Sequence, residues 1–207
     1  MNVVRIGKFS PINYFHDVAR IHATEIQVGL LSKLGVAFLT SFYRYVASDR
    51  DCALFAAVED EKVVGFVSGT KALPEFYRRF MMRRGFALGA YFFLHLIRSW
   101  TLPRVGSFRR YLNSNESTSL PTAELMSLAV GSGCQRRGLG KILFAEFQEY
   151  FRGQGIAAFK VAAAVSQTAA LRFYPTVGGK LAARTYLGEL EAHIFVCHTR
   201  IDVDVVT

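Results

Sequence analysis

Apolar side chains along this chain alternate between helical and strand spacing, and the order of the two predicts a mixed α/β fold. Val3–Ile6 predicts a short strand, and Pro11–Glu25 and Leu30–Val46 carry apolar residues three or four positions apart, as on one face of a helix. The apolar runs Ala53–Val58 and Val63–Gly69 follow, with four polar residues between them. A compact polar turn between two apolar runs predicts a β-hairpin.

The second half of the chain repeats this alternation with sharper boundaries. Leu125–Val130 predicts a buried strand, Gly131–Gln135 a loop and Gly138–Arg152 a helix. The remaining predicted elements are a strand at Ile156–Ala164, a short helix at Gln167–Tyr174 that ends near Pro175, and strands at Leu181–Leu187 and Ala192–Thr199. No repeat or linker-like composition divides the chain, so we expect one domain over residues 1–207.

A basic and aromatic stretch at about residues 74–115 interrupts the alternation and predicts an inserted helical segment. Eight arginines lie between residues 78 and 110 without one acidic residue among them. Within this stretch Phe86–Ile97 is nearly all apolar, but only thirteen residues separate Arg84 from Arg98. A helix that crosses a membrane needs about 20 consecutive apolar residues. The segment therefore predicts either a helix buried against the domain or one that lies on an anionic membrane surface.

Charge and cysteine content narrow the class of protein. The formal net charge is +9, and the arginine cluster predicts either a solvated surface or an anionic partner: a phosphate-bearing substrate, a membrane surface or a nucleic acid. Nucleic acid is the weakest of the three, because the chain has no helix-turn-helix or aromatic RNA-binding motif. Cys52, Cys134 and Cys197 lie far apart, which argues against disulfides and a zinc site. We expect no metal and a cytoplasmic location, with peripheral membrane attachment as the alternative.

The segment Gln135–Lys141 lies where a predicted strand is followed by a predicted helix. The first backbone N–H groups of a helix have no intrahelical partner, and the positive end of the helix dipole favours an anion there. Gly138 and Gly140 lack a Cβ and let phosphate oxygens approach the backbone, while Arg136 and Arg137 add charge. The segment lacks the Walker and dinucleotide glycine patterns. It predicts a diphosphate cradle of another kind.

Ala123–Val130 followed by Gln135–Gly140 resembles the acetyl-coenzyme A motif of the Gcn5-related N-acetyltransferase (GNAT) superfamily, Gln/Arg-x-x-Gly-x-Gly/Ala. The similarity continues through Val165–Tyr174, which resembles the family's Asn-x-x-Ala-x-x-x-Tyr helix with Gln167 in place of Asn. It covers residues 123 to about 180. The resemblance implies a GNAT-like α/β fold whose central, mostly antiparallel sheet is splayed at the cofactor site, and acetyl-CoA as co-substrate.

The same resemblance implies roles for individual residues. The backbone of Leu128, Ala129 and Val130 would pair with the pantetheine arm of the coenzyme as a neighbouring strand does. The other implied cofactor-binding residues are Gln135, Arg136, Arg137, Gly138, Leu139, Gly140, Lys141, Gln167 and Ala170. Direct transfer in a ternary complex needs a group that deprotonates the amine and one that protonates the thiolate. Glu124 is the candidate base and Tyr174 the candidate acid.

The acceptor side is less defined. His22 and Glu25, one helical step apart, would face the acceptor groove in the family layout, although a lone histidine on a helix is more often structural. We expect a small-molecule primary amine, such as an amino sugar or a nucleotide-linked amino sugar, with protein amines as an alternative. A different class also fits: a membrane-surface acyl-CoA-binding protein, or an acyltransferase acting on a lipid-linked or protein acceptor.

Overall fold

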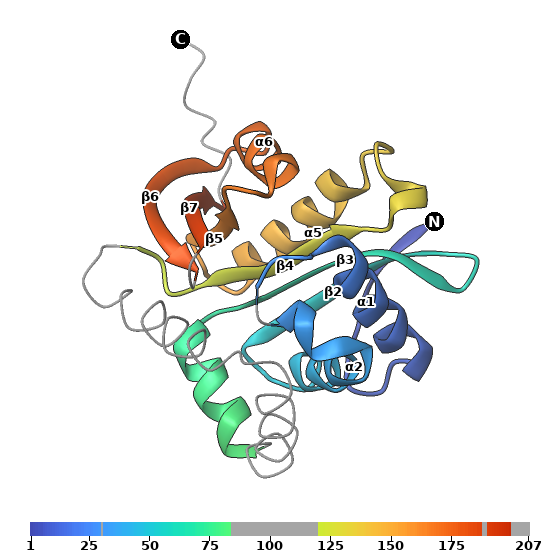
Figure 1. Ribbon diagram of the computed structural model, residues 1–207. Helices are drawn as coiled ribbons and strands as arrows, with labels where there is room; N and C mark the ends of the chain where they lie inside the picture. The colour runs from blue at the N-terminus through green and yellow to red at the C-terminus, as the bar shows by residue number, and fades with distance from the viewer. Residues whose placement is uncertain (30, 84–119, 188–189, 200–207) are drawn as a thin grey trace.

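The computed structural model describes residues 1–29, 31–83, 120–187 and 190–199, which form a sheet with helices on both faces (Figure 1). The strands are β1 (Asn2–Arg5), β2 (Cys52–Glu59), β3 (Lys62–Thr70), β4 (Glu124–Val130), β5 (Ala158–Ala164), β6 (Lys180–Leu187) and β7 (Leu190–His198). The helices are α1 (Ile12–Glu25), α2 (Gly35–Val46), α5 (Leu139–Gly153) and α6 (Thr168–Thr176), with 3₁₀ turns η1 (Leu31–Leu34) and η2 (Ser132–Cys134). Residues 73–83 are also helical.

The seven strands lie in the order β1-β2-β3-β4-β5-β7-β6. Each neighbouring pair is antiparallel except β4 and β5, which are parallel. The predicted mixed α/β fold with a mostly antiparallel sheet is thus confirmed. The β2–β3 hairpin is confirmed as well: Asp60 and Glu61 both have positive φ, 49° and 61°, which is the backbone of a tight two-residue hairpin turn.

Two predicted helices have different boundaries in the structure. The helix predicted at Leu30–Val46 is divided, because Gly35 takes a φ of 79° between the 3₁₀ turn η1 and α2. The short helix predicted to end near Pro175 ends at Thr176, one residue later. A proline in the last turn removes one N–H, and the chain keeps turning through a bond from Val177 N to Tyr174 O at 3.2 Å.

Residues 73–83, at the start of the predicted insertion, are helical. Residues 84–119 lie outside the described part of the chain. The interpretations of Phe86–Ile97 as a buried or a membrane-surface helix therefore stay predictions.

Helices cover both faces of the sheet (Figure 1), and each face has its own apolar core. On one face α1 and α2 cover β2, β3 and β4, with a core that includes Phe15, Phe42 and Phe66. On the other face α5 and α6 pack through aromatic residues, among them Phe147 and Phe159. The alternation of side chains along each strand therefore decides which residues face α1 and α2 and which face α5 and α6.

His22 on α1 lies inside the first of these cores and is 2% exposed. Its Nδ1 is hydrogen-bonded to the Tyr43 hydroxyl at 2.6 Å, and its Nε2 lies 3.5 Å from the Ser32 hydroxyl. The ring also stacks on Phe66 at 6.4 Å between centroids. Burial lowers the pKa of His22 to about 4, because a charged imidazolium would lose its hydration there. The structure therefore places His22 as a neutral core residue.

We expect Gly69→Ala to lower the free energy of unfolding by about 1–3 kcal/mol or more. A Cβ at Gly69 would lie 2.3 Å from Phe147 Cζ and 2.6 Å from the Glu124 carbonyl oxygen, so α5 would have to move away from the sheet. Urea denaturation measures the change. Gly153→Ala is the control, because a Cβ there meets no atom within 4 Å. Equal stability of the two variants would contradict this packing.

We expect the stability of the protein to fall as the pH drops from 6.5 towards 4, with His22 contributing on the order of 3 kcal/mol. The unfolded chain takes up a proton on this imidazole near pH 6.5, whereas the folded protein does so only near pH 4. The contribution of His22 to stability is therefore fully present above the pKa of the unfolded chain. It is lost as the pH falls towards the pKa of the folded protein. Urea denaturation across this range should give a shallower pH dependence for His22→Gln than for the native sequence; identical slopes would refute the assignment.

Candidate functional site

Strands β4 and β5 lie side by side at one end and then separate. Their only residue pair within the described part of the chain is Glu124 with Lys160, supported by a hydrogen bond from Lys160 N to Ala123 O at 2.9 Å. Beyond this pair β4 is paired with β3 alone, and β5 with β7 alone. The edge of β4 that faces β5 thus has backbone groups outside the sheet ladder.

The residues predicted to bind the coenzyme arm lie along this edge. Leu128, Ala129 and Val130 pair with β3 on one side and face the separated β5 on the other. A register shift near Ser68 leaves Met126 as an extra residue in β4, and such a bulge bends the strand that carries it. An extended ligand has room to add itself to this edge as a strand.

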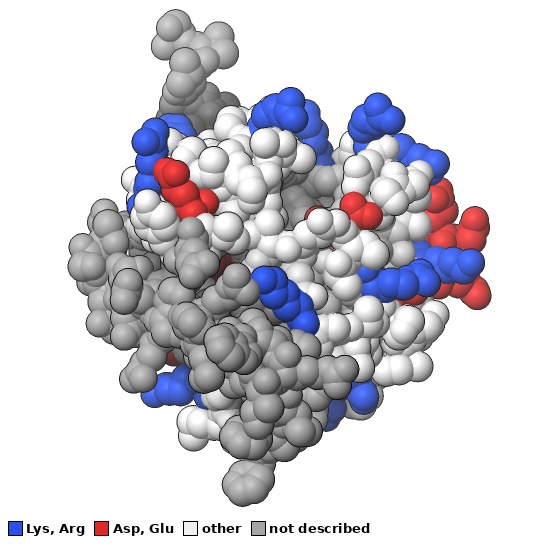
Figure 2. All heavy atoms as spheres, in the orientation of Figure 1, with Lys and Arg blue, Asp and Glu red and all other residues white. Residues whose placement is uncertain are grey.

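The predicted phosphate loop follows directly and ends at the first turn of α5. Gly138 has a φ of 78°, a conformation that favours glycine, and precedes the first helical residue, Leu139. The N–H groups of Leu139 and Gly140 belong to the first turn and have no intrahelical acceptor. Figure 2 shows a hollow on this face over the start of α5, between α6 and the loop, with basic atoms on both sides. This geometry suits an anion.

Two carboxylates hold the loop in place. Glu25 at the end of α1 accepts hydrogen bonds from Ser132 N at 3.0 Å and from Gln135 Nε2 at 2.9 Å. The same Gln135 nitrogen lies 3.0 Å from the Val130 carbonyl oxygen. Glu25, predicted for the acceptor groove, is therefore engaged with the phosphate loop.

Glu59 at the end of β2 is the second carboxylate, and the sequence analysis did not select it. It forms an ion pair with Arg137 at 3.6 Å, so one of the two predicted phosphate-binding arginines already has an acidic partner. Arg136 and Lys141 are exposed on the same loop and helix start. The sequence around Glu59 does not indicate this contact, because Arg137 is far along the chain.

Helix α6 places Gln167, Ala170 and Tyr174 beside the end of β5. Gln167 precedes the first turn, and its amide oxygen accepts a hydrogen bond from Ala164 N at 3.1 Å. Ala170 and Tyr174 pack in the α5 and α6 core, where the Tyr174 ring lies 5.7 Å from that of Phe195. Burial, with a smaller contribution from Cys197, raises the pKa of Tyr174, so its phenol keeps the proton at neutral pH.

Glu124 lies on the opposite face of the sheet from Tyr174. Leu125 packs in the α5 and α6 core, so alternation directs the preceding residue towards the other face. There the carboxylate approaches Tyr77 of the helical residues 73–83, whose pKa is raised by burial first and by the charge of Glu124 second. Its Oε2 also lies 3.8 Å from Lys160 Nζ. Sequence reasoning missed Lys160, although a lone lysine in the apolar run of β5 was a signal.

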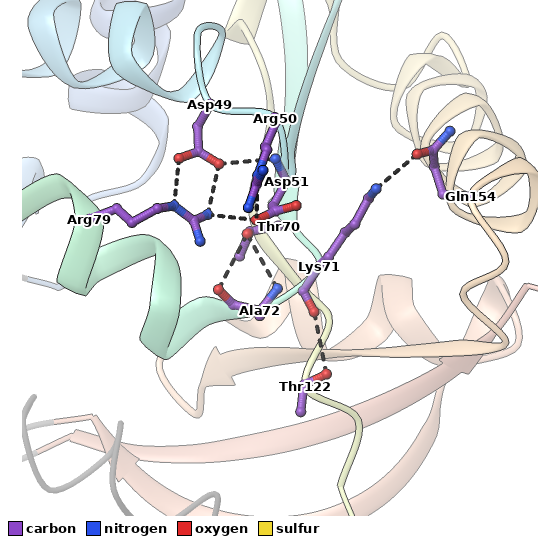
Figure 3. A network of polar contacts seen from close by, with 9 residues as sticks. All are labelled: Asp49, Arg50, Asp51, Thr70, Lys71, Ala72, Arg79, Thr122 and Gln154. Carbon is purple, nitrogen blue, oxygen red and sulfur yellow. Dashed lines mark hydrogen bonds and ion pairs between the residues drawn. The ribbon is translucent and has the colours of Figure 1, made fainter.

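In the described part of the basic stretch, Arg79 makes contacts within the protein. Arg79 donates hydrogen bonds to both carboxylate oxygens of Asp49, at 3.0 and 2.8 Å, and pairs with Asp51 at 2.9 Å (Figure 3). Burial acts to raise the pKa of Asp49, but the hydrogen bonds from Arg79 and from the Asp51 amide outweigh it and lower the pKa. Arg79 thus fixes residues 73–83 to the turn between α2 and β2.

The described residues contain neither a metal-binding cluster nor a membrane-spanning helix. No cluster of three or more His, Cys, Asp or Glu side chains is placed there to hold a metal ion. In the same part of the chain, no helix is long and apolar enough to cross a membrane.

Solved structures of known proteins have the same fold. A GNAT-family protein from Desulfovibrio desulfuricans is 14% identical, with 96% of this chain and 99% of that one covered at a TM-score of 0.60. NAA60 from Arabidopsis thaliana, solved in complex with acetyl-CoA, is 15% identical with 95% and 97% coverage and a TM-score of 0.60. Ard1 from Thermoplasma volcanium is 16% identical with 95% and 96% coverage and a TM-score of 0.58.

Comparison by sequence gives the family directly. No curated protein matches the chain. The model of the acetyltransferase (GNAT) family matches residues 23–178, a span that contains the separated strands, the phosphate loop and α6. The chain therefore belongs to the GNAT family of acetyltransferases.

Proposed function

We propose that this protein is an acetyl-CoA-dependent N-acetyltransferase that transfers the acetyl group directly to a primary amine. One observation carries the proposal: β4 and β5 separate immediately before a loop that opens the N-terminus of α5. A strand edge without a neighbour suits the amide-rich pantetheine arm, and an open helix N-terminus suits the diphosphate. The strand edge and the helix N-terminus follow one another in the same order as the pantetheine arm and the diphosphate of the coenzyme.

Residues of the loop would bind the diphosphate mainly through the backbone. A Cβ at Gly140 would lie 3.5 Å from Phe173, an ordinary contact, so packing within the protein does not explain this glycine. Close approach of a phosphate does. Arg136 and Lys141 would add positive charge at the exposed rim, while Arg137 would have to leave Glu59 to do so.

Glu124 and Tyr174 are suited to the two proton transfers of the reaction. In our scheme Glu124 removes a proton from the acceptor amine, directly or through water, as the nitrogen attacks the thioester carbonyl carbon. The C–N bond forms, the C–S bond breaks, and the Tyr174 hydroxyl protonates the departing thiolate. Their positions on opposite faces of the sheet support this division, because nucleophile and leaving group lie on different sides of the reacting carbon.

The acceptor is proposed at the level of chemical class. A small-molecule primary amine, including an amino sugar or its nucleotide-linked form, fits a base on the face covered by residues 73–83. NAA60 from Arabidopsis thaliana was also solved with a bisubstrate analogue. Attachment to an anionic membrane surface rests mainly on residues outside the described part, and Arg79 is already paired. The cytoplasmic location also stays a prediction.

We expect Gly138→Glu to weaken acetyl-CoA binding about tenfold or more, because a carboxylate at the start of α5 would repel the diphosphate. Isothermal titration calorimetry measures the dissociation constant. Gly155→Glu is the matched control: Gly155 also has a positive φ, 73°, and no atom within 4 Å of an added Cβ. The control adds the same charge and the same backbone strain away from the loop. Equal affinity of the two variants would contradict the proposed site.

We expect Glu124→Gln and Tyr174→Phe each to lower kcat by about 10²–10⁴-fold, with acetyl-CoA affinity retained. Both substitutions keep the shape of the side chain and remove only the group that moves a proton. Coupled detection of released coenzyme A thiol measures the rate with an accepted amine. Tyr186→Phe, at an exposed position of β6, is the control and should leave kcat unchanged. A Glu124→Gln enzyme with normal kcat would exclude Glu124 as the base.

A further inference from the structure

Lys160 is buried although it is a lysine. Its side chain is 1% exposed, and its neighbours along β5, Phe159 and Val161, belong to the apolar core of α5 and α6. Lysine is almost never fully buried unless it is paired. Its partner is Glu124, with 3.8 Å between Nζ and Oε2 and with 7% of the glutamate side chain exposed.

Stability alone does not account for this pair. Removing two charges from water costs more than their attraction returns in many proteins, and apolar residues of similar volume are often as stable or more so. Burial acts to lower the pKa of Lys160, and the charge of Glu124 partly opposes it. A charged pair at this position therefore calls for another explanation.

The position of the pair suggests that explanation. Glu124 and Lys160 form the one residue pair between β4 and β5, so the two charges lie where the strands begin to separate. Side-chain alternation directs both towards the face that carries residues 73–83, away from the α5 and α6 core. Among the described ionisable groups, the Tyr77 phenol interacts with Glu124, and the Cys52 thiol also influences Tyr77.

We propose that Lys160 is a positioning residue for catalysis, whose buried ammonium keeps the Glu124 carboxylate ionised so that it can accept the proton of the acceptor amine. This inference rests on the proposed function. Burial without a positive neighbour favours the protonated form of a carboxyl group, which cannot act as a base. Lys160 itself forms and breaks no bond; the proton moves from the amine nitrogen to Glu124.

The first test reads the charge of Glu124 without any assay of activity. In protein labelled with ¹³C at glutamate carboxyl carbons, assigned with Glu124→Gln, the Glu124 signal should show an ionised group at neutral pH. In Lys160→Met, or in Lys160→Gln if the first does not fold, its protonation should move upward by about 1–3 pH units. A protonated Glu124 in the native protein at neutral pH overturns the proposal without any variant.

The second test is the pH dependence of kcat/KM for one amine. Loss of Lys160 should shift the acid limb of the kcat/KM profile to higher pH, so that much of the lost activity returns at higher pH. The double variant Glu124→Gln/Lys160→Met should lack this shift. Lys180→Met is the matched control. Lys180 is exposed, and it pairs across the sheet with Val196, which also pairs with Lys160. A uniform loss of rate with an unmoved limb would make Lys160 merely structural and overturn the proposal.

The outcomes separate this inference from the proposed function. A native protein that binds no acetyl-CoA and acetylates no amine would refute the proposed function, whatever the charge of Glu124. An active native enzyme whose Lys160 variants keep the same acid limb and the same Glu124 signal would refute only the role of Lys160.

Discussion

Strands β4 and β5 are paired at one residue and then diverge, and the proposed binding of the coenzyme depends on where they separate. A fully paired parallel sheet would bury the β4 edge and leave no backbone groups for a ligand. Because α1 and α2 cover one face and α5 and α6 the other, the opening between the strands connects two separate surfaces. In the proposed reaction, the coenzyme and the acceptor would therefore approach the same point from different sides.

The packing of α5 fixes the other half of the arrangement. Gly69 in β3 gives Phe147 a place directly against the sheet, which sets how close the helix lies to the strands. The start of the same helix carries Gly138 and the open amides of the first turn. The orientation of an anion site is thus decided by an apolar contact about two helical turns away, because a helix transmits position along its axis.

Local patterns in the sequence predicted the helices and strands well, but they did not predict the contacts between distant segments. The hairpin at Asp60 and the strand, loop and helix around Gly138 follow from spacing and turn chemistry over a few residues, and the structure has them. The division of the second helix at Gly35 depended on one backbone angle, which a helical apolar pattern conceals.

Long-range polar pairs escaped the sequence analysis for a physical reason. Glu25 contacts Gln135, and Glu124 contacts Lys160, only after the sheet has set its register, and nothing in the composition of either segment specifies the partner. His22 showed the converse problem: an ionisable residue on a helix suggested an acceptor site, while the fold placed it in the core with Tyr43. Burial decides such cases, and burial is a property of the whole fold.

The hydrogen bonds of Glu25 have a consequence for the energetics of ligand binding. The carboxylate holds Ser132 N and the Gln135 side chain through contacts within the chain, and so ties the phosphate loop to the end of α1. A loop ordered in this way is preorganised: the entropy lost in fixing it is part of folding and does not weaken the association with a ligand. Because of the same contacts, a displacement of the end of α1 would also displace the loop.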